Sequence, residues 1–571
     1  MPNNASQPYL KISKLNITYK SENHLVRAVK DLSLELKSGE ILGLAGESGS
    51  GKTSICKSLL GVCPAHLSGK IVYNGKNLLE NKKHEWKKIR WNKISYCFPN
   101  SREILNPSYS VLEQMIEPML ESGFRRKRAI EHARDLLFKC KLPIEKHDSY
   151  PVHLSGGELQ RVMIALTLVN DPEMVIFDEP TSGIDIRNRN EIVELLKEIL
   201  KNKTCIIVTH DLLLLRKLAD KIGILYKGVL VELAPAHLFF RNQHHPYSRA
   251  LYNSFTSLET SREMSRIRDR RNNLSHSTVN GCVFADRCTQ AIEKCFKDMP
   301  RLLSYYSDRQ IACHRKGVVS LIRTTNLSKI YRKSGSLWGP KIQVLKDVNV
   351  NVEAGEVVAL VGESGAGKTT LGQIICGLID PEDGEMNIDE TVHRNDVQYI
   401  FQDPEESLSP RYTVLEAIRE PLDIKNKFDL NTKNEMARKM LANVGLYTNA
   451  AFCDRFCSQL SSGEAQRLCI GRALITSPRV LVADEPVSRL DPSEQVRVLK
   501  LLLELQTDFG IGLFFITHNL YLARKISRRI YVIHQGRIIE EGFTETVLDQ
   551  PRHPLTRNMV NLAFSKKAEV Y

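Results

Sequence analysis

The sequence has no run of about 18 consecutive apolar residues, the length that a membrane-spanning helix needs. Its first residues, MPNNASQPYLKISK, lack the apolar segment of a secretory signal peptide. It also lacks long blocks of like charge, because its densest basic stretches, near 121–130 and 261–271, are short. These absences predict a cytosolic chain without a transmembrane helix. Its net charge of +14 fits solvated helix surfaces better than it fits attraction to anionic membranes or nucleic acid, although both readings stay open.

One ordered set of motifs occurs twice in the chain. GESGSGKT at 46–53 and GESGAGKT at 362–369 both fit the phosphate-binding pattern G-x-x-x-x-G-K-[ST]. LSGGELQR, MVIFDEP and IIVTH follow the first, and LSSGEAQR, VLVADEP and FFITH follow the second in the same order. The 571 residues therefore contain two similar halves of about 250 residues each and a connecting region.

Short apolar segments alternate with longer helical patterns in both halves. We expect buried strands at 40–45, 174–178, 205–209, 480–484 and 512–517, and helices within 111–140, 149–169 and 413–450. This alternation predicts an α/β fold with a mostly parallel sheet in each half. We predict a first nucleotide-binding domain at 1–255, a cysteine-containing linker at 256–318 and a second nucleotide-binding domain at 319–571.

At LSGGELQR, residues 154–161, the chain resembles the ATP-binding cassette (ABC) family, and the resemblance spans nearly the whole sequence. It implies two tandem P-loop ABC ATPase cassettes, each with a parallel sheet core and a helical subdomain. It also implies that the cassettes pair head to tail, so that the signature of each acts on the nucleotide of the other. Fusion of the cassettes in one chain raises their effective concentration.

ATP and Mg²⁺ are the ligands that these motifs predict. Lys52 and Lys368 are expected to contact the β- and γ-phosphates, and the glycines allow close backbone approach. The predicted ATP-binding residues are Tyr19, Gly46, Glu47, Ser48, Gly49, Ser50, Gly51, Lys52, Thr53, Ser155, Gly156, Gly157, Tyr331, Gly362, Glu363, Ser364, Gly365, Ala366, Gly367, Lys368, Thr369, Ser461, Ser462 and Gly463. Tyr19 and Tyr331 match the family's adenine-stacking aromatic, although each fits a core tyrosine as well.

The apolar strands at 174–178 and 480–484 each end in the aspartate of a DEP triplet. Asp178 and Asp484, together with Thr53, Thr369 and Gln402, are predicted to hold Mg²⁺. The resemblance makes Glu179 and Glu485 the general-base candidates and gives His210 and His518 a γ-phosphate contact. Asp185 and Asp491 match the family's acidic turn between the two sites. The alternative for the acidic pairs is that they only cap strand ends.

The two halves differ at two motif positions. Gln402 in FQDP matches the family's glutamine that reaches Mg²⁺ and the attacking water, whereas the first half has Pro99 there, followed by Asn100. Ser462 replaces the glycine that the first signature has at Gly156, and a Cβ is expected to narrow the backbone freedom there. With head-to-tail pairing, both departures fall in one composite site, which we predict to be degenerate. Neutral drift with two active sites is the alternative.

The segments HHPYSRALYNS at 244–254 and RHPLTRNMVN at 552–561 resemble the tail of ATPases from the oligopeptide, dipeptide and nickel importer family. This resemblance implies a fused twin-cassette ATPase on the cytoplasmic face of the cell membrane. The implied partners are two integral-membrane permeases and, indirectly, an external solute-binding protein, and no nucleic acid is expected. The solute could be a di- or oligopeptide, a glutathione-like peptide, nickel or a metal chelate.

Four cysteines cluster in the connecting region, at Cys282, Cys288, Cys295 and Cys313. Four thiolates can hold zinc or an iron–sulfur cluster, but the tight C-x₂₋₄-C pairs that zinc sites usually show are absent. The arrangement resembles the cluster-binding tail of some dipeptide-importer ATPases, which implies a [4Fe–4S] cluster. Zinc and the absence of any metal are the alternatives.

The motifs together predict the ATP-hydrolysing subunit of a membrane ABC importer. The segments EPM at 117–119 and EPL at 420–422 are expected to lie in grooves for the permeases' cytoplasmic helices. A soluble twin-cassette ATPase that acts on ribosomes or nucleic acid is the alternative, which the basic charge allows. The two tails and the lack of a long charged helical arm between the halves argue against it.

Overall fold

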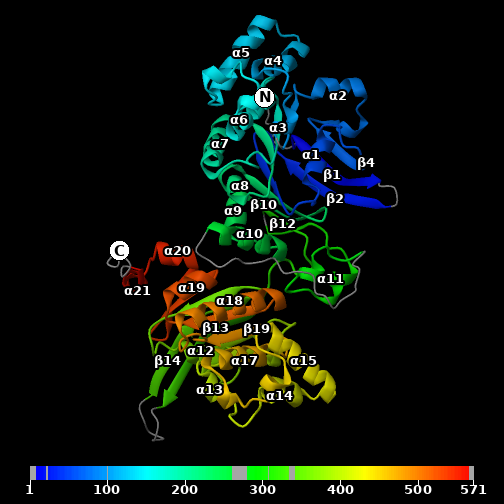
Figure 1. Ribbon diagram of the computed structural model, residues 1–571. Helices are drawn as coiled ribbons and strands as arrows, with labels where there is room; N and C mark the ends of the chain where they lie inside the picture. The colour runs from blue at the N-terminus through cyan, green and yellow to red at the C-terminus, as the bar shows by residue number, and fades with distance from the viewer. Residues whose placement is uncertain are drawn as a thin grey trace. The chain divides into compact units, whose positions relative to one another are not determined.

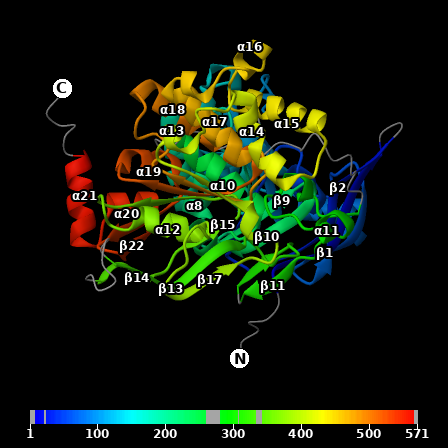
Figure 2. The same cartoon turned by 90° about the horizontal axis from the view of Figure 1, so that it is seen from below.

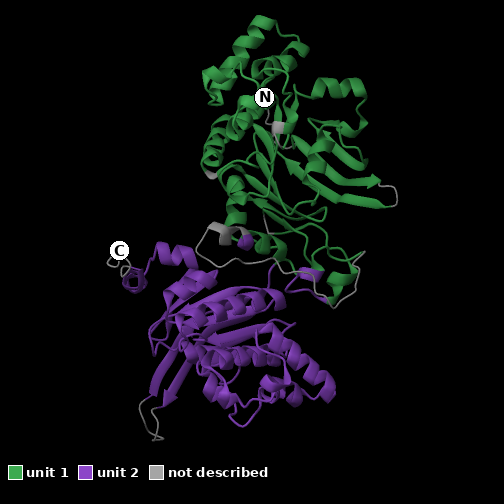
Figure 3. Cartoon of the chain, viewed as in Figure 1, with its two compact units in different colours: residues 1–252, 276–285, 293–317 green, residues 253–275, 286–292, 318–571 purple. Residues whose placement is uncertain are grey.

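The computed structural model describes residues 8–20, 24–99, 101–259, 280–306, 308–332 and 341–564. The chain divides into two compact units, which Figure 3 colours separately. Unit 1 comprises residues 1–252, 276–285 and 293–317, and unit 2 comprises residues 253–275, 286–292 and 318–571. The connecting region is thus divided between both units, and the separate linker at 256–318 stays a prediction.

A central, mostly parallel sheet forms the core of unit 1 (Figure 1), in the order β11-β12-β10-β9-β3-β8-β7-β6. Its strands are β3 (Ile41–Ala45), β6 (Ile94–Cys97), β7 (Met174–Asp178), β8 (Thr204–Val208), β9 (Lys221–Tyr226), β10 (Val229–Pro235), β11 (Leu303–Tyr306) and β12 (Arg309–Ile311). Neighbouring strands in the stretch β9-β3-β8-β7-β6 pair in parallel. Strands β10, β12 and β11 extend the sheet beyond β9 with antiparallel pairs. Every residue of β7 and β8 is buried, as expected for a parallel sheet covered on both faces.

A second, antiparallel sheet of unit 1 has the order β2-β1-β4-β5. Its strands are β1 (Leu10–Lys20), β2 (Leu25–Leu36), β4 (His66–Tyr73) and β5 (Lys76–Asn77). The alternating apolar residues of β1 and β2 point into a core that includes Leu10, Ile12, Leu34 and Leu36. The sequence pattern of these two segments is therefore explained by one buried face and one exposed face.

The helices of unit 1 include a packed group formed by α4, α5 and α6. The α-helices are α1 (Lys52–Leu59), α2 (Lys83–Ile89), α3 (Ser101–Ile104), α4 (Val111–Glu121), α5 (Arg126–Lys139), α6 (Gly156–Leu168), α7 (Ile186–Ile199), α8 (Leu212–Leu218), α9 (Ala236–Arg241), α10 (Pro246–Glu259) and α11 (Glu293–Lys297). Short 3₁₀ helices are η1 (Leu78–Glu80), η2 (Ile144–Lys146), η3 (Pro151–His153) and η4 (Ala285–Arg287). The helical stretch predicted within 111–140 is thus two helices, α4 and α5, separated by a turn.

Unit 2 repeats this architecture. A central sheet has the order β18-β19-β20-β16-β21-β22, and a smaller sheet has the order β14-β13-β15 with β17 paired to β13. Figure 2 shows β13, β14 and β17 side by side, in agreement with their antiparallel pairing. The strands are β13 (Ser320–Arg332), β14 (Lys341–Val348), β15 (Asn351–Glu353), β16 (Val357–Val361), β17 (Asp383–Ile388), β18 (Val397–Ile400), β19 (Val480–Asp484), β20 (Gly512–Thr517), β21 (Arg529–His534) and β22 (Arg537–Phe543).

The helices of unit 2 include a packed group of α14, α15 and α17, the counterpart of α4–α6. The helices are α12 (Lys368–Ile375), α13 (Pro404–Ser407), α14 (Val414–Lys425), α15 (Leu430–Asn443), α16 (Ala450–Cys453), α17 (Ser462–Leu474), α18 (Pro492–Phe509), α19 (Leu520–Ile526), α20 (Thr544–Asp549) and α21 (Pro554–Phe564), with 3₁₀ helices η5 (Arg394–Asp396) and η6 (Cys457–Gln459). Across the described ranges of both units, no helix combines the length and apolar character needed to cross a bilayer.

Candidate ATP-binding sites

The two phosphate loops join the central strands β3 and β16 to the helices α1 and α12. Gly51 and Gly367 are the N-cap residues of these helices, and both have φ of 100°, a conformation that glycine adopts without steric cost. Nζ of Lys52 donates to the carbonyl oxygens of Gly46 and Glu47 at 2.8 and 2.9 Å. Nζ of Lys368 makes the corresponding bonds in the second loop, at 3.0 and 2.9 Å. Both ammonium groups are therefore held inside their loops, where bound phosphates would lie.

The pKa values of the two loop lysines are lowered, in each case because burial disfavours the charged form. The charges of Glu179 and Asp178 oppose the shift at Lys52, and those of Glu485 and Asp484 oppose it at Lys368. Each lysine thus lies within electrostatic range of the two acidic residues that end the neighbouring strand. This places the motifs of each half around one site.

Oxygen ligands suited to Mg²⁺ meet at the start of α1 and the end of β7. Oγ1 of Thr53 donates to Oδ2 of Asp178 at 2.7 Å, and Thr369 makes a side-chain hydrogen bond to Asp484 in the second half. Hydroxyl and carboxylate oxygens are the hard ligands that Mg²⁺ takes in proteins. These predicted residues therefore fit the ion chemically in both halves.

A tyrosine holds each of these aspartates in place. The hydroxyl groups of Tyr96 on β6 and Tyr399 on β18 donate to Oδ2 of Asp178 and Asp484, each at 2.7 Å. Burial and the nearby carboxylates raise the pKa of both tyrosines, so the hydroxyls stay protonated donors. Burial also raises the pKa of Asp484, although the bonds from Thr369 and Tyr399 oppose that shift. Neither tyrosine belongs to a predicted motif, but their matching positions before Pro99 and Gln402 are a usable signal in the sequence.

The general-base candidates lie beside the histidines predicted to contact the γ-phosphate. Nδ1 of His210 is 2.9 Å from Oε1 of Glu179, and Nδ1 of His518 is 3.0 Å from Oε1 of Glu485. Both glutamates have positive φ, 52° for Glu179 and 44° for Glu485. A non-glycine residue in this region costs conformational energy and is common at functional sites. The repeat of this strained backbone in both halves agrees with the predicted role.

One cavity of about 550 Å³ gathers the predicted residues of the second site. Its walls include Lys368, Thr369, Gln402, Glu485 and His518. The loop that binds phosphate, the predicted Mg²⁺ ligand, the base and the histidine thus open into the same space. This arrangement can hold a nucleotide triphosphate and a water molecule next to a carboxylate.

The second carboxylate oxygen of each base has a different partner in the two halves. Nε2 of Gln402 donates to Oε2 of Glu485 at 3.4 Å, as the predicted position of this glutamine requires. In the first half, Oγ1 of Thr209 donates to Oε2 of Glu179 at 3.0 Å, and Pro99 offers no side-chain donor. Asn100, the residue after Pro99, lies outside the described residues. The difference expected at Pro99 and Gln402 is therefore present among the described contacts.

The two signature motifs lie at the N-termini of helices α6 and α17. Ser155 and Ser461 are the N-cap residues, and their side chains accept the backbone N–H groups of Glu158 and Glu464 in reciprocal capping boxes. The expected restriction at Ser462 is not supported, because Gly156 begins a regular helix without positive φ. A Cβ added at Gly156 would have only the carbonyl oxygen of Gly183 nearby, at 3.9 Å. A serine fits this position without steric conflict.

The remaining predicted residues take ordinary structural positions. The hydroxyl of Tyr19 on β1 lies 3.0 Å from Oγ of Ser54 in α1, which brings the ring near the phosphate-loop helix. Tyr331 is 39% exposed near the end of β13, and Nζ of Lys329 lies over its ring at 5.7 Å from the centroid. Asp185 and Asp491 are the N-caps of α7 and α18. Adenine stacking by the tyrosines and coupling through the aspartates stay predictions.

The four cysteines of the connecting region are divided between the two units. Cys282, Cys295 and Cys313 belong to unit 1, where the backbone N–H of Cys282 donates to the carbonyl of Cys295 at 2.7 Å. Burial raises the pKa of Cys282 to about 12, opposed by N–H bonds from Phe284 and Ala285. Burial also raises the pKa of Cys313, opposed by N–H bonds from Gly317 and Arg315.

Backbone N–H groups directed at sulfur are among the features that tune protein iron–sulfur sites. Yet no group of three or more His, Cys, Asp or Glu side chains in the described ranges is placed to hold a metal ion. The thiols thus have suitable donors around them but are not gathered as a ligand set. The [4Fe–4S] cluster on Cys282, Cys288, Cys295 and Cys313 stays a prediction.

The two tail segments begin helices in the same way. Glu232 of β10 accepts the backbone N–H groups of His244 and His245 at 3.1 and 2.9 Å, and Nδ1 of His245 accepts the N–H of Tyr247. In unit 2, Glu540 accepts the N–H groups of Arg552 and His553, and Nδ1 of His553 accepts the N–H of Leu555. The repeated H-P pair therefore marks a repeated helix start, which is bound by a glutamate of β10 in unit 1 and of β22 in unit 2.

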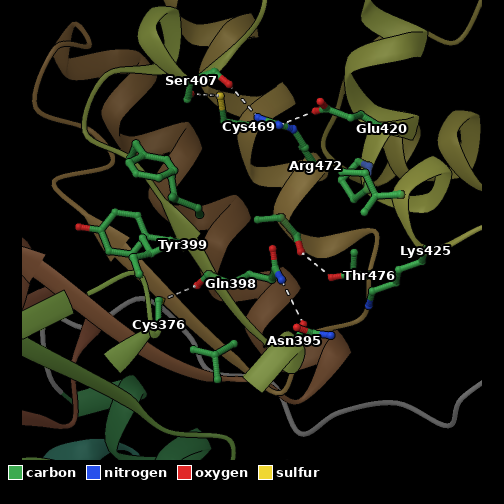
Figure 4. Close-up of a pocket in the computed structure, with 17 residues that line it drawn as sticks. Cys376, Asn395, Gln398, Tyr399, Ser407, Glu420, Lys425, Cys469, Arg472 and Thr476 are labelled. Atoms are coloured by element: carbon green, nitrogen blue, oxygen red, sulfur yellow. Dashed lines mark hydrogen bonds and ion pairs between the residues drawn. The ribbon is translucent and has the colours of Figure 1, made fainter. Parts of the chain in front are cut away.

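A groove of about 410 Å³ lies in unit 2 between the sheet edge and the helical group (Figure 4). Its lining includes Tyr399 and Phe401, Pro421 and Lys425 from the EPL segment and its helix, and Arg472 from α17. Figure 4 shows Arg472 between two partners: it donates to the carboxylate of Glu420 at 2.5 Å and to the carbonyl of Ser407 at 2.7 Å. The predicted EPL segment thus does line a groove.

Comparison with known proteins agrees with this geometry. Residues 29–182 and 345–488 both match the ABC transporter family, and residues 231–295 match the C-terminal region of oligopeptide/dipeptide transporters. The oligopeptide transport ATP-binding protein OppD of Mycobacterium tuberculosis is 30% identical over 97% of this chain and 98% of its own length. The glutathione import ATP-binding protein GsiA of Escherichia coli K12 is 32% identical over 96% of this chain and 89% of its own length.

A solved dimeric ATP-binding cassette in a post-hydrolysis state is 27% identical, with a TM-score of 0.37, and covers 40% of this chain and 98% of its own length. The fold and the two sets of site residues define a P-loop ATPase with two cassettes. The matches show that the chain belongs to the ABC transporter family, as a fused twin-cassette ATPase of the oligopeptide type. The resemblance expected from the motifs is therefore confirmed.

Proposed function

We propose that this chain is the energy-coupling subunit of a membrane importer for peptides, bound to the cytoplasmic face of the membrane. The observation that carries the proposal is the gathering of Lys368, Thr369, Gln402, Glu485 and His518 around one cavity. The oligopeptide-type tail and the names of the relatives support short peptides, glutathione among them, as the solute class. Only the resemblance of the tail segments to the oligopeptide, dipeptide and nickel importer family supports nickel or a metal chelate as the solute.

The residues of the second site suit in-line hydrolysis of ATP. Lys368 leaves its carbonyl partners to neutralise the β- and γ-phosphates, and the N–H groups of the loop bind phosphate oxygens. Bound Mg²⁺, held by Thr369, Asp484 and Gln402, would offset the charge on the phosphate oxygens. Glu485 accepts a proton from the attacking water, while His518 holds Glu485 in orientation and reaches the γ-phosphate.

The two composite sites are proposed to be unequal. In this proposal the first loop works with the second signature, and the second loop works with the first signature. The supporting contact is that Gln402 bonds Glu485, whereas Thr209 takes the corresponding oxygen of Glu179 and Pro99 offers no donor. Because Ser462 fits its helix without conflict, the inequality rests on Pro99 and not on the signature.

The groove of unit 2 is proposed to receive a cytoplasmic helix of one permease subunit. It is partly apolar, through Tyr399, Phe401 and Pro421, and it carries the Glu420–Arg472 ion pair and Lys425 at its border. An apolar floor with a polar rim is typical of surfaces that accept an amphipathic helix. The EPM segment of α4 would provide the matching contact for the second permease. An external solute-binding protein would then deliver peptide to the permeases.

We also propose a [4Fe–4S] cluster on the four cysteines, without any part in the ATPase cycle described above. The backbone N–H groups near the thiols of Cys282 and Cys313, which act to lower the pKa of both, support it. The described residues do not form a ready ligand set, so the proposal requires the four thiols to gather when the cluster is assembled.

Reconstitution tests the proposed function. The chain would be co-expressed with the two permease subunits of a candidate peptide importer, purified in detergent and placed in liposomes with the solute-binding protein of that importer. Uptake of labelled peptide that requires ATP, and that Lys368→Ala abolishes, is the expected result. If the chain instead purifies with ribosomes or nucleic acid and shows no permease-dependent ATPase activity, the importer assignment is wrong.

A further inference from the structure

The tail of the first cassette makes direct contact with the first phosphate loop. Tyr247, the second residue of α10, is fully buried, and its hydroxyl oxygen accepts the backbone N–H of Glu47 at 3.0 Å. The two residues are 200 positions apart in the sequence, yet both lie in unit 1. The H-P-Y motif thus has a partner in the ATP site, beyond its role at the start of a helix.

This hydrogen bond and the loop lysine hold the same peptide group from opposite ends. The peptide bond between Gly46 and Glu47 presents its N–H to Tyr247, and its carbonyl oxygen accepts Nζ of Lys52 at 2.8 Å. When Lys52 moves to the phosphates of a bound nucleotide, the carbonyl loses that partner. Tyr247 then remains as the side chain that fixes the orientation of this peptide at the base of the loop.

The second loop has the lysine bond but not the tyrosine bond. Lys368 donates to the carbonyl of Gly362 at 3.0 Å, as Lys52 does to Gly46. The residue that corresponds to Tyr247 is Leu555, which is 38% exposed and has no hydroxyl. In the described part of unit 2, no side chain takes the place of Tyr247 at the N–H of Glu363. The contact therefore distinguishes the two ATP sites.

Several neighbouring groups fix the orientation of the Tyr247 side chain. Its own backbone N–H donates to Nδ1 of His245 at 3.1 Å, and its ring packs on Tyr226 and Phe284 with centroid distances of 4.4 and 5.4 Å. Burial lowers the pKa of His245 to about 3, so the imidazole is neutral and Nδ1 can accept this bond at neutral pH.

The helix start that carries Tyr247 is itself anchored by a buried ion pair. Glu232 binds the N–H of His245 and pairs with Arg309 at 2.9 Å, both side chains being almost fully buried. Arg309 and Phe284 come from residues 280–285 and 308–317 of unit 1, where Phe284 packs on the buried ring of Tyr247 and Arg309 pairs with Glu232. In unit 2, Glu540 binds the corresponding N–H groups, but no arginine among the described residues pairs with it.

We propose that Tyr247 is a positioning residue of the first ATP site. It keeps the Gly46–Glu47 peptide in its binding orientation after Lys52 has transferred to the phosphates, so the loop does not reorganise when nucleotide binds. Preorganised donors bind phosphate more tightly than donors that must first be ordered. The consequence is that the first loop retains nucleotide more firmly than it would without the tail. The inference rests on ATP binding by the first loop and not on import.

Nucleotide binding to the purified full chain tests this inference without permeases. In a Lys368→Ala chain, binding of a fluorescent ATP analogue reports mainly the first loop, and in a Lys52→Ala chain it reports mainly the second. Tyr247→Phe keeps the buried ring and removes only the hydroxyl. We expect it to weaken binding about two- to tenfold in the first chain, the usual effect of one hydrogen bond, and to leave binding unchanged in the second.

Tyr73→Phe is the matched control, because it also removes a buried hydroxyl of unit 1, one that bonds Glu173 at 2.9 Å away from the loop. It should not alter binding in either chain. Unchanged affinity of Tyr247→Phe in the Lys368→Ala chain, or equal weakening in both chains, would overturn the proposal.

If Tyr247→Phe does not fold, amide hydrogen exchange in the unaltered chain tests the proposal instead. The N–H of Glu47 should exchange at least several-fold more slowly than that of Glu363, because only the former is bonded to a buried hydroxyl. Equal exchange rates at Glu47 and Glu363 would remove the basis of the proposal.

Discussion

Nδ1 of His210 lies 2.9 Å from Oε1 of Glu179, and this contact shifts the two groups in opposite directions. Burial alone would raise the pKa of Glu179, but the bond and charge of His210, with Thr209, lower it overall. The bond to Glu179 raises the pKa of His210, although burial opposes it. The pair therefore favours an ionised carboxylate beside a protonated imidazole.

A pH-dependent contribution to stability follows from these shifts. Ionised Glu179 stabilises the fold above its ordinary pKa of 4.5, and the effect is lost as pH falls through the lowered value. Protonated His210 contributes fully below its ordinary pKa of 6.5, and its effect is lost as pH rises through the raised value. His210→Ala should therefore lower the melting temperature more at about pH 6 than at about pH 8.5. Thermal unfolding at both values measures this.

The control for this prediction is the same substitution in a Glu179→Gln chain. A neutral amide cannot raise the pKa of the histidine by its charge, so His210→Ala should have nearly the same effect at both pH values there. A pH-dependent difference that persists without the Glu179 carboxylate would show that another group is responsible.

The two general-base candidates should contribute unequally to ATP turnover. Glu485→Gln should reduce steady-state ATPase activity of the assembled importer about a hundredfold, because a positioned base typically contributes at least that much. Glu179→Gln should leave a measurable fraction, since Gln402 bonds only Glu485. ATPase assays of both variants and of the double variant, with equal protein amounts, measure this. Equal losses or the reverse order would contradict the inequality.

The motif residues could be placed from the sequence because each set is local. A phosphate loop, a strand that ends in Asp-Glu and a strand that ends in Thr-His are each a few residues long. The parallel order of β16, β20 and β19 then brings the carboxyl ends of these strands together in unit 2. The site built from Lys368, Glu485 and His518 was therefore predictable before any coordinates were known.

Contacts between distant segments could not be predicted in the same way. The bond between Glu47 and Tyr247 depends on the path of the chain over 200 residues, and no periodic pattern records it. The strands β11 and β12 come from a region that was expected to be only a linker, yet they extend the first sheet through β10. The backbone restriction expected at Ser462 finds no support within its own cassette, because this position lies in a regular helix, which the motif alone does not reveal.

Metal analysis tests the cysteine cluster directly. Chain purified without oxygen should contain about four iron and four sulfide ions, and Cys282→Ser should remove most of both. The control is Cys205→Ser, since Cys205 is a buried thiol of β8 away from the connecting region. Stoichiometric zinc without iron, or retention of iron in the Cys282→Ser chain, would refute the assignment.

Binding of the permeases to the groove of unit 2 should depend on the partly buried ion pair between Arg472 and Glu420. Arg472 bridges Glu420 of α14 and the carbonyl of Ser407, so Arg472→Ala would leave the Glu420 carboxylate unpaired at the groove and loosen its wall. We expect co-purification with the permeases to fall about tenfold, as for truncation of an interface arginine. Nucleotide binding by the isolated chain should stay unchanged, because Arg472 does not line the ATP cavity.

The matched control is Arg419→Ala. Arg419 belongs to the same helical group and pairs with Asp423 at 2.9 Å, but it does not line the groove. Equal loss of permease binding in both variants would show that the helical group as a whole, and not the groove, is responsible.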